Sequence, residues 1–252
     1  MNGTTMDTLY DRIRAALRSA PHLGPRFRVD RLEIDAGGVL TLQGAAPSVA
    51  AKKEALERAA AFPEVTAVVD RLHVTPSAPM SDDGIRDHLR KFFTRDPAFA
   101  ELVVRELRRP APAPDAPADY ALVSGDPAAA RGEIDIEVRD GVVILNGRTP
   151  GLTSKRLAGV MAWWVPGVRD VVNGLEVDPP EEDAPILIEE AVALALERDP
   201  YVDASQIRVG VRDRVVRLTG YVPSAPVRAM AEQDAWCVFG VDRVINEIAV
   251  GR

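Results

Sequence analysis

Residues 141–177 read GVVILNGRTPGLTSKRLAGVMAWWVPGVRDVVNGLEV, and the same pattern occurs twice more in the chain. A shift of 103 positions aligns the first copy with the second, and a shift of 73 aligns the second with the third, without a gap over 31 positions. The shared positions include Gly44, Gly147 and Gly220, then Ala55, Ala158 and Ala231, and finally Val74, Val177 and Val250. Self-similarity at fixed offsets indicates a repeated structural unit. We therefore predict three copies of one small fold.

Each copy follows an amphipathic helix with apolar residues at helical spacing, predicted at 7–19, at 83–95 and directly after Asp183. Two short strands, a second helix and a third strand complete the unit. The predicted units are residues 1–76, 81–178 and 184–252. The middle unit carries a Pro/Ala-rich insertion at about 98–131. We expect this insertion to begin with a helix at 98–109 and to continue without regular structure over 110–127.

Two details of the repeat concern local geometry. Asp140-Gly141 between two short strands is typical of a type I′ hairpin turn, whereas the third unit has Asp213-Arg214 at the same place. We therefore expect either a strained residue or a different turn at Arg214. In the second helix, Ala55, Ala158 and Ala231 are each followed by another alanine four residues later. Two small residues one turn apart let the helix approach the sheet closely.

Composition and charge exclude several classes of protein. The net charge is −7, divided as +1 over residues 1–78, −3 over 79–178 and −5 over 179–252. A protein that follows the phosphates of a nucleic acid needs a basic stripe, so we expect no nucleic-acid partner. The single cysteine, Cys237, excludes an intrachain disulfide and a multi-cysteine metal site. We see neither a signal peptide nor a transmembrane segment in the chain as given and expect a cytoplasmic protein.

The order of helix, hairpin, helix and strand, combined with the repeated motif, resembles the BON domain, named for bacterial osmotic-stress and nodulation proteins. Gly141-Val142-x-x-Leu145-x-Gly147 and Val165-Pro166-Gly167-Val168-x-x-Val171-x-Asn173-x-Leu175-x-Val177 carry the resemblance. The third copy matches with Phe239-Gly240-Val241 and Asn246, while the first departs with Pro63-Glu64-Val65 and Asp70. The resemblance implies an α+β fold of three tandem α-β-β-α-β units. Each would be a three-stranded mixed sheet with two helices on one face.

The resemblance also implies a non-catalytic role, with no family-wide catalytic residues to carry over. It suggests a binding or scaffolding protein that associates with a phospholipid surface or an envelope or partner protein, often under osmotic or other stress. One relative in the family is a potassium sensor, so a cytoplasmic protein that senses a monovalent cation is the alternative function. We expect no cofactor and no metal site. No Ser/His/Asp or Cys/His grouping clusters in the sequence, which argues against an enzyme.

The candidate binding residues lie on the second helix of the middle unit, where Leu157–Val165 has no polar side chain. A helix that is apolar all round is either covered on both sides or part of an interaction site. On the second account, Val160, Trp163 and Trp164 form an exposed patch, and Lys155 and Arg156 meet anionic groups beside it. A structural role is expected for Asp70, Asn173 and Asn246, in the third strand of each unit. Their side chains are expected to satisfy nearby backbone groups.

Overall fold

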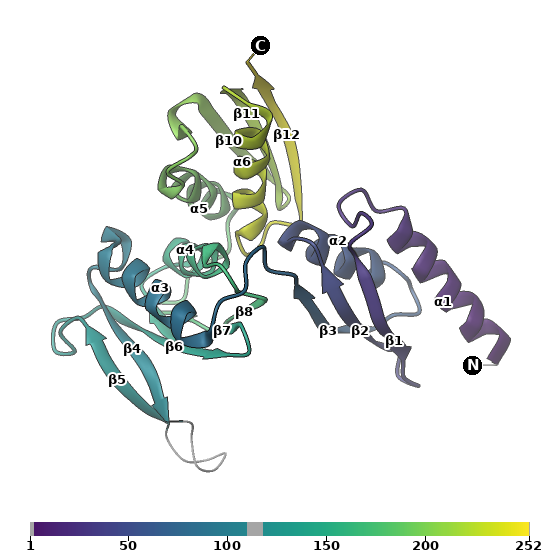
Figure 1. The fold of residues 1–252 in the computed structure, drawn as a ribbon, viewed down its shortest axis with the longest axis horizontal. Helices are drawn as coiled ribbons and strands as arrows, with labels where there is room; N and C mark the ends of the chain where they lie inside the picture. Colours follow the sequence, from purple (N-terminus) through teal and green to yellow (C-terminus); the bar gives the residue numbers. More distant parts are fainter. Residues whose placement is uncertain (1–2, 110–117, 252) are drawn as a thin grey trace. The chain divides into compact units, whose positions relative to one another are not determined.

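The computed structural model describes residues 3–109 and 118–251. The chain divides into two compact units, Met1–Pro76 and Ser77–Arg252, so the second and third repeats pack together in one unit (Figure 1). The boundaries proposed for three separate repeats remain a prediction. Within the described ranges, no helix combines the length and the apolar character that a membrane crossing requires.

The first unit contains α1 (Gly3–Arg18), β1 (Arg28–Ile34), β2 (Val39–Ala46), α2 (Val49–Ala60) and β3 (Ala67–Val74). The sheet order is β1-β2-β3, with β1 antiparallel and β3 parallel to β2. Side chains of β2 alternate between buried and half-buried, as expected for a strand with one face on a core. One apolar cluster joins α1, α2 and the sheet, so both helices cover the same face.

The third repeat has the same topology, built from α5 (Pro185–Arg198), β10 (Ile207–Arg212), β11 (Val215–Val222), α6 (Ala225–Cys237) and β12 (Arg243–Val250). Its sheet order is β10-β11-β12, again with one antiparallel and one parallel pair. The α+β fold and its three-unit layout, predicted from the repeat and the family resemblance, are therefore confirmed.

The middle repeat contains α3 (Asp82–Arg95), β6 (Gly132–Arg139), β7 (Val142–Thr149) and α4 (Leu152–Trp164). Its third strand is divided into β8 (Asp170–Asn173) and β9 (Glu176–Val177), both parallel to β7. Ser81 caps the N-terminus of α3, and its hydroxyl oxygen accepts a hydrogen bond from Gly84 N.

The insertion corrects two expectations. The helix predicted at 98–109 is wrong: a short 3₁₀ turn (Pro97–Phe99) leads into the strand β4 (Leu102–Arg109), and β5 (Asp119–Ser124) follows. β4 pairs in parallel with β6, and β5 pairs antiparallel with β4, which extends the middle sheet to six strands in the order β5-β4-β6-β7-β8 with β9 beside β7. The absence of regular structure expected over 110–127 is also wrong for Asp119–Ser124, while 110–117 lie outside the described residues. The run Leu102-Val103-Val104 favours a strand because branched side chains pack well on a pleated surface.

The repeated glycines are required by close approach between strands. A Cβ added at Gly44 would lie 1.9 Å from Arg28 O, and one at Gly220 would lie 2.0 Å from Gln206 O. The hairpin turns of the last two repeats share one conformation. Asp140 and Gly141 have φ of 52° and 76°, and Asp213 and Arg214 have φ of 48° and 61°. Arg214 is therefore a non-glycine residue in the left-handed region, where a side chain is strained.

Candidate functional site

The three Asx residues of the repeat connect the third strand to the second helix. Asn173 Nδ2 donates to Lys155 O at 2.7 Å, and Asn246 Nδ2 donates to Arg228 O at 3.0 Å. In the first repeat the corresponding residue is Asp70, which has no donor, and its carboxylate instead forms an ion pair with Lys52 Nζ at 2.9 Å. Each side chain also accepts a hydrogen bond from the backbone N–H two residues later. These contacts place the three residues in the framework of the fold.

The five candidate binding residues all lie on α4, the helix of the middle repeat that packs on the third. Val160 is fully buried, and α4 contacts both α5 and α6. Trp163 is half-buried and packs against the apolar cluster of the middle repeat. Trp164 Nε1 donates to Asp234 Oδ1 at 2.9 Å, across to α6. The structure thus places Trp164 against the neighbouring repeat and Trp163 against the core of its own repeat, and their binding of a partner remains a prediction.

The two cations at the start of α4 also contact the third repeat. Arg156 is fully buried, and its guanidinium binds Asp183 Oδ1 at 2.5 Å and Phe239 O at 2.9 Å. Lys155 Nζ lies 5.9 Å from the centre of the Phe239 ring, a distance at which a cation is attracted by an aromatic face. In this structure the two residues therefore hold the linker and the loop before β12 against α4.

A buried carboxyl pair lies in the same interface. Asp234 on α6 and Asp199 at the end of α5 are both buried. Burial, followed by the charge of Asp199, raises the pKa of Asp234 to about 8, and the hydrogen bond from Trp164 acts in the opposite direction. Among the described residues, Asp234 Oδ2 is buried without a hydrogen-bond partner. The interface between the two repeats therefore contains a carboxyl group whose charge is costly.

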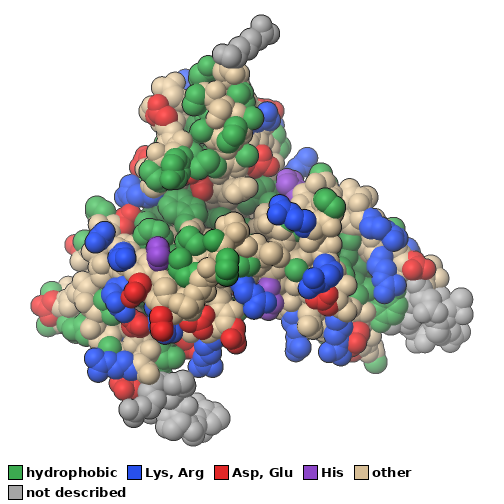
Figure 2. Space-filling model, in the orientation of Figure 1, with side chains coloured by type: hydrophobic (Ala, Val, Ile, Leu, Met, Phe, Trp, Pro, Cys, Tyr) green, Lys and Arg blue, Asp and Glu red, His purple; other side chains and the backbone are tan. Residues whose placement is uncertain are grey.

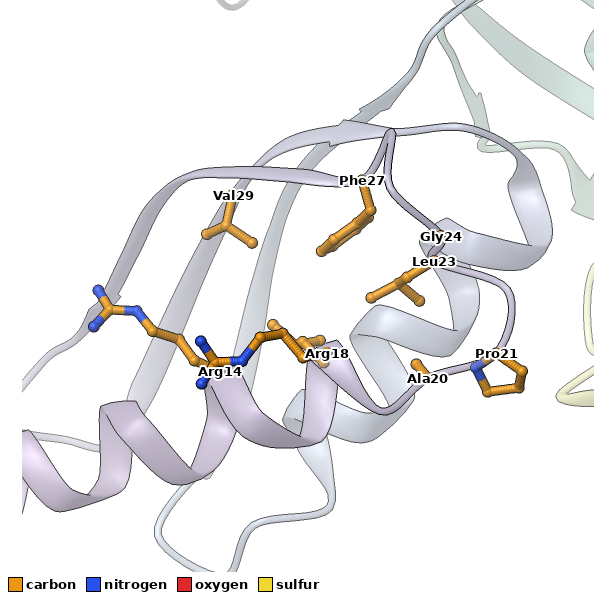
Figure 3. Close-up of a pocket in the computed structure, with 9 residues that line it drawn as sticks. Arg14, Arg18, Ala20, Pro21, Leu23, Gly24, Phe27 and Val29 are labelled. Carbon is orange, nitrogen blue, oxygen red and sulfur yellow. The ribbon is translucent and has the colours of Figure 1, made fainter.

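One pocket large enough for a small ligand lies in the first unit (Figure 3). It has a volume of about 380 Å³ and is formed between the last turns of α1, the loop that follows and the start of β1. Its lining residues are Arg14, Leu17, Arg18, Ala20, Pro21, Leu23, Gly24, Phe27 and Val29. Figure 3 shows Leu23, Phe27 and Val29 directed toward α1. The floor of the pocket is therefore apolar.

Two arginines give this pocket a positive rim. Arg14 and Arg18 lie one turn apart on α1 and are exposed. Arg14 approaches Asp11 only to 4.0 Å, and Arg18 forms no ion pair with any other described side chain. Figure 2 shows Lys and Arg side chains prominent on the visible face of the first unit. The arrangement suits a ligand with an apolar group and an adjacent negative charge.

Reasoning from the sequence missed this pocket because its lining comes from a helix, a loop and a strand that the sequence does not bring together. The available signal was the pair Arg14 and Arg18 beside the apolar face of the first helix, in the one repeat with a positive charge balance. Within the described ranges, no group of three His, Cys, Asp or Glu side chains is arranged to hold a metal ion.

Individual known proteins show weak similarity to this chain or none. A search of curated proteins found no match. Among solved structures, the C-terminal domain of CdsD, a structural protein of the type III secretion system of Chlamydia trachomatis, matches at 15% identity over 97% of this chain and 98% of that chain, with a TM-score of 0.25. A second CdsD structure matches at 15% identity over 97% and 92%, with a TM-score of 0.24. These values are too low to carry a functional conclusion.

A protein-family model matches most of the chain. The model of the BON domain matches residues 7–76, 121–179 and 187–252, one segment in each repeat and well over half of the chain. The same three copies of the motif were apparent from the repeated Gly, Ala and Val positions. This protein belongs to the BON domain family.

Proposed function

We propose that this protein is a non-enzymatic binding or scaffolding protein that uses the pocket of its first unit to hold a phospholipid surface or a partner protein. The observation that carries the proposal is the pocket itself, with an apolar floor and a rim of two arginines. The second and third repeats pack on each other through α4, α5 and α6 and form a separate compact unit.

The chemistry of the pocket favours a ligand that is apolar on one side and negatively charged on the other. Leu17 and Leu23 are buried beneath it, and Phe27 and Val29 are half-buried along its wall. Covering such surface contributes roughly 25 cal/mol for each Å² of apolar area removed from water. Arg14 and Arg18 add attraction for a phosphate or a carboxylate. An acyl chain beside a phosphate and an apolar side chain beside a carboxylate both satisfy these requirements.

The test compares the full chain with a double variant in which Arg14 and Arg18 are both changed to Glu. A matched control is Arg71→Glu on β3, the opposite edge of the same sheet, because Arg71 is exposed and lies outside the pocket. Binding is measured by co-sedimentation with phosphatidylglycerol or phosphatidylcholine vesicles and by pulldown from an extract of the source cells. The double variant should lose at least one interaction that the control retains. Equal binding by all three proteins in both assays would show that the pocket is not the binding site.

The alternative, a potassium-sensing protein, is tested separately. A ligand that binds only the folded state stabilises it by RT ln(1 + L/Kd), where L is the ligand concentration, and so raises the melting temperature. Potassium sensing therefore requires a larger rise in KCl than in NaCl at equal ionic strength.

A further inference from the structure

The first helices of the first and middle repeats, α1 and α3, can be aligned in sequence. A shift of 76 positions brings Pro21 onto Pro97 and aligns the buried residues of α1 with those of α3. The same shift brings three pocket residues onto residues of the middle repeat: Leu17 onto Phe93, Leu23 onto Phe99 and Arg14 onto Arg90. The pocket of the first unit therefore has a counterpart in the middle repeat.

In the middle repeat this place is filled by the chain itself. The strand β4 lies parallel to β6, with Leu102 opposite Gly132 and Val104 opposite Ile134. Leu102 and Val104 are buried in the cluster that contains Phe93 and Phe99, whose rings meet edge to face at 5.2 Å. The side chains on this face of β4 thus occupy the space that is open in the first unit.

The middle repeat also has a charged contact at the position that corresponds to the arginine rim of the pocket. Glu106, two residues after Val104 and therefore on the same face of β4, binds Arg90 Nη2 at 2.6 Å. It also lies 3.3 Å from Arg86 Nε. Arg90 is the counterpart of Arg14. The middle repeat therefore shows which pattern its groove accepts: two apolar residues in alternation, followed by a carboxylate.

The outer edge of β1 is open in the first unit, and β1 carries a bulge between Val29 and Arg31 that β6 lacks. In the described part of the chain, β1 pairs with β2 alone, whereas its counterpart β6 pairs on both sides. The charges along β1 are already compensated, because Arg28 binds Asp30 at 2.7 Å and Arg31 binds Glu33 at 2.5 Å. An added strand would meet unpaired backbone groups without meeting uncompensated charge.

We propose that the pocket and the outer edge of β1 receive an extended segment of a partner protein, added parallel to β1. The segment would place two alternate apolar side chains in the pocket and a carboxylate two residues later at Arg14, as β4 does in the middle repeat. Main-chain hydrogen bonds would supply affinity and the alternate side chains specificity, as in other cases of strand addition. This inference rests on the proposed function and specifies its ligand as a peptide.

Comparison with the third repeat indicates why the first repeat is the proposed peptide-binding site. β10 is also an edge strand, paired in the described residues with β11 alone. Ala193 stands there in place of Arg14 and Arg90, so the third repeat lacks the cation that the carboxylate needs. The acidic residue of the segment therefore selects the first unit.

The experiment uses a fluorescein-labelled synthetic peptide with the sequence of residues 101–108, ELVVRELR, and the full chain. Fluorescence anisotropy should show saturable binding to the wild-type chain, weakened at least tenfold by Arg14→Glu and unchanged by Arg71→Glu. A second peptide with lysine in place of the glutamate corresponding to Glu106 should bind the Arg14→Glu chain more tightly than the wild type. This exchange of charges separates a lost contact from a misfolded variant.

The outcomes are distinguishable from those of the proposed function. If neither peptide binds while vesicle binding depends on Arg14 and Arg18, strand addition is wrong and the pocket holds phospholipid. If the peptide binds equally well to the wild type and to the Arg14→Glu chain, the assigned place of the segment is wrong. If neither peptide nor vesicle depends on the arginines, both proposals fail.

Discussion

The buried carboxyl of Asp234 makes the stability of the second unit depend on pH, and Asp234→Asn should remove that dependence. Asp234 is 5% exposed, accepts a hydrogen bond from Trp164 at 2.9 Å, and has a pKa raised to about 8 by burial and by Asp199. In the unfolded chain the pKa returns to its ordinary value of 3.8. Between these two values the folded state keeps a proton that the unfolded state releases.

The sign and the magnitude follow from proton linkage. Because the folded state binds the extra proton, the free energy of unfolding decreases as pH rises, by up to about 1.4 kcal/mol per pH unit. The contribution of this group is fully present below about pH 4 and is lost as the pH rises through about 8. From pH 5.5 to 7.0 the wild type should therefore lose about 2 kcal/mol from this one carboxyl. Asn keeps the oxygen that accepts from Trp164 but carries no charge.

The assay is urea unfolding followed by tryptophan fluorescence at several pH values. All three tryptophans, Trp163, Trp164 and Trp236, lie in the second unit, so the signal reports on that unit. Other titrating groups are common to both proteins and cancel in the difference. Glu197→Gln, an exposed change on α5, serves as the control and should keep the wild-type slope. Equal slopes for Asp234→Asn and the wild type would show that Asp234 does not keep a proton in the folded state.

Three further changes test the packing and the corrected insertion. Arg214 has φ of 61°, and its side chain donates a hydrogen bond to Gly240 O. Both Arg214→Gly and Arg214→Ala lose this bond, but only alanine keeps the backbone strain, so the glycine variant should be more stable in urea unfolding by about 1 kcal/mol. Equal stabilities of the two variants would contradict a shared turn. Trp163→Gln should lower the stability of the second unit by roughly 3 kcal/mol, because the ring packs on the core, and should leave partner binding unchanged. Loss of binding with an intact fold would instead support the exposed patch. Replacing Asp119–Ser124 with a Gly/Ser stretch of equal length should lower the melting temperature, because the pairing of β5 with β4 is lost. Each kcal/mol of lost stability corresponds to a decrease of about 2–4 °C. An unchanged melting temperature would show that β5 does not stabilise the fold.

The repeated framework can be predicted from the sequence. Gly44, Gly147 and Gly220 repeat because each lies where two strands approach too closely for a Cβ, so no other residue fits. Ala55, Ala158 and Ala231 repeat because all three are fully buried on the second helix of their unit. These are local requirements that every copy must meet, and for that reason they can be read from a single chain. The α+β fold and the family followed from them.

Features that depend on contacts between residues distant in sequence could not be predicted from the local pattern. Leu102–Arg109 became a strand because the edge of β6 offered hydrogen bonds, which the local pattern could not reveal. Val160 is buried because α5 and α6 lie against α4, so an apolar helix that was open to two interpretations is covered by the next repeat. The pocket beside Arg14 exists because the first unit lacks the strand that fills its counterpart. Each of these depends on long-range packing, which sets both what is buried and what is left open.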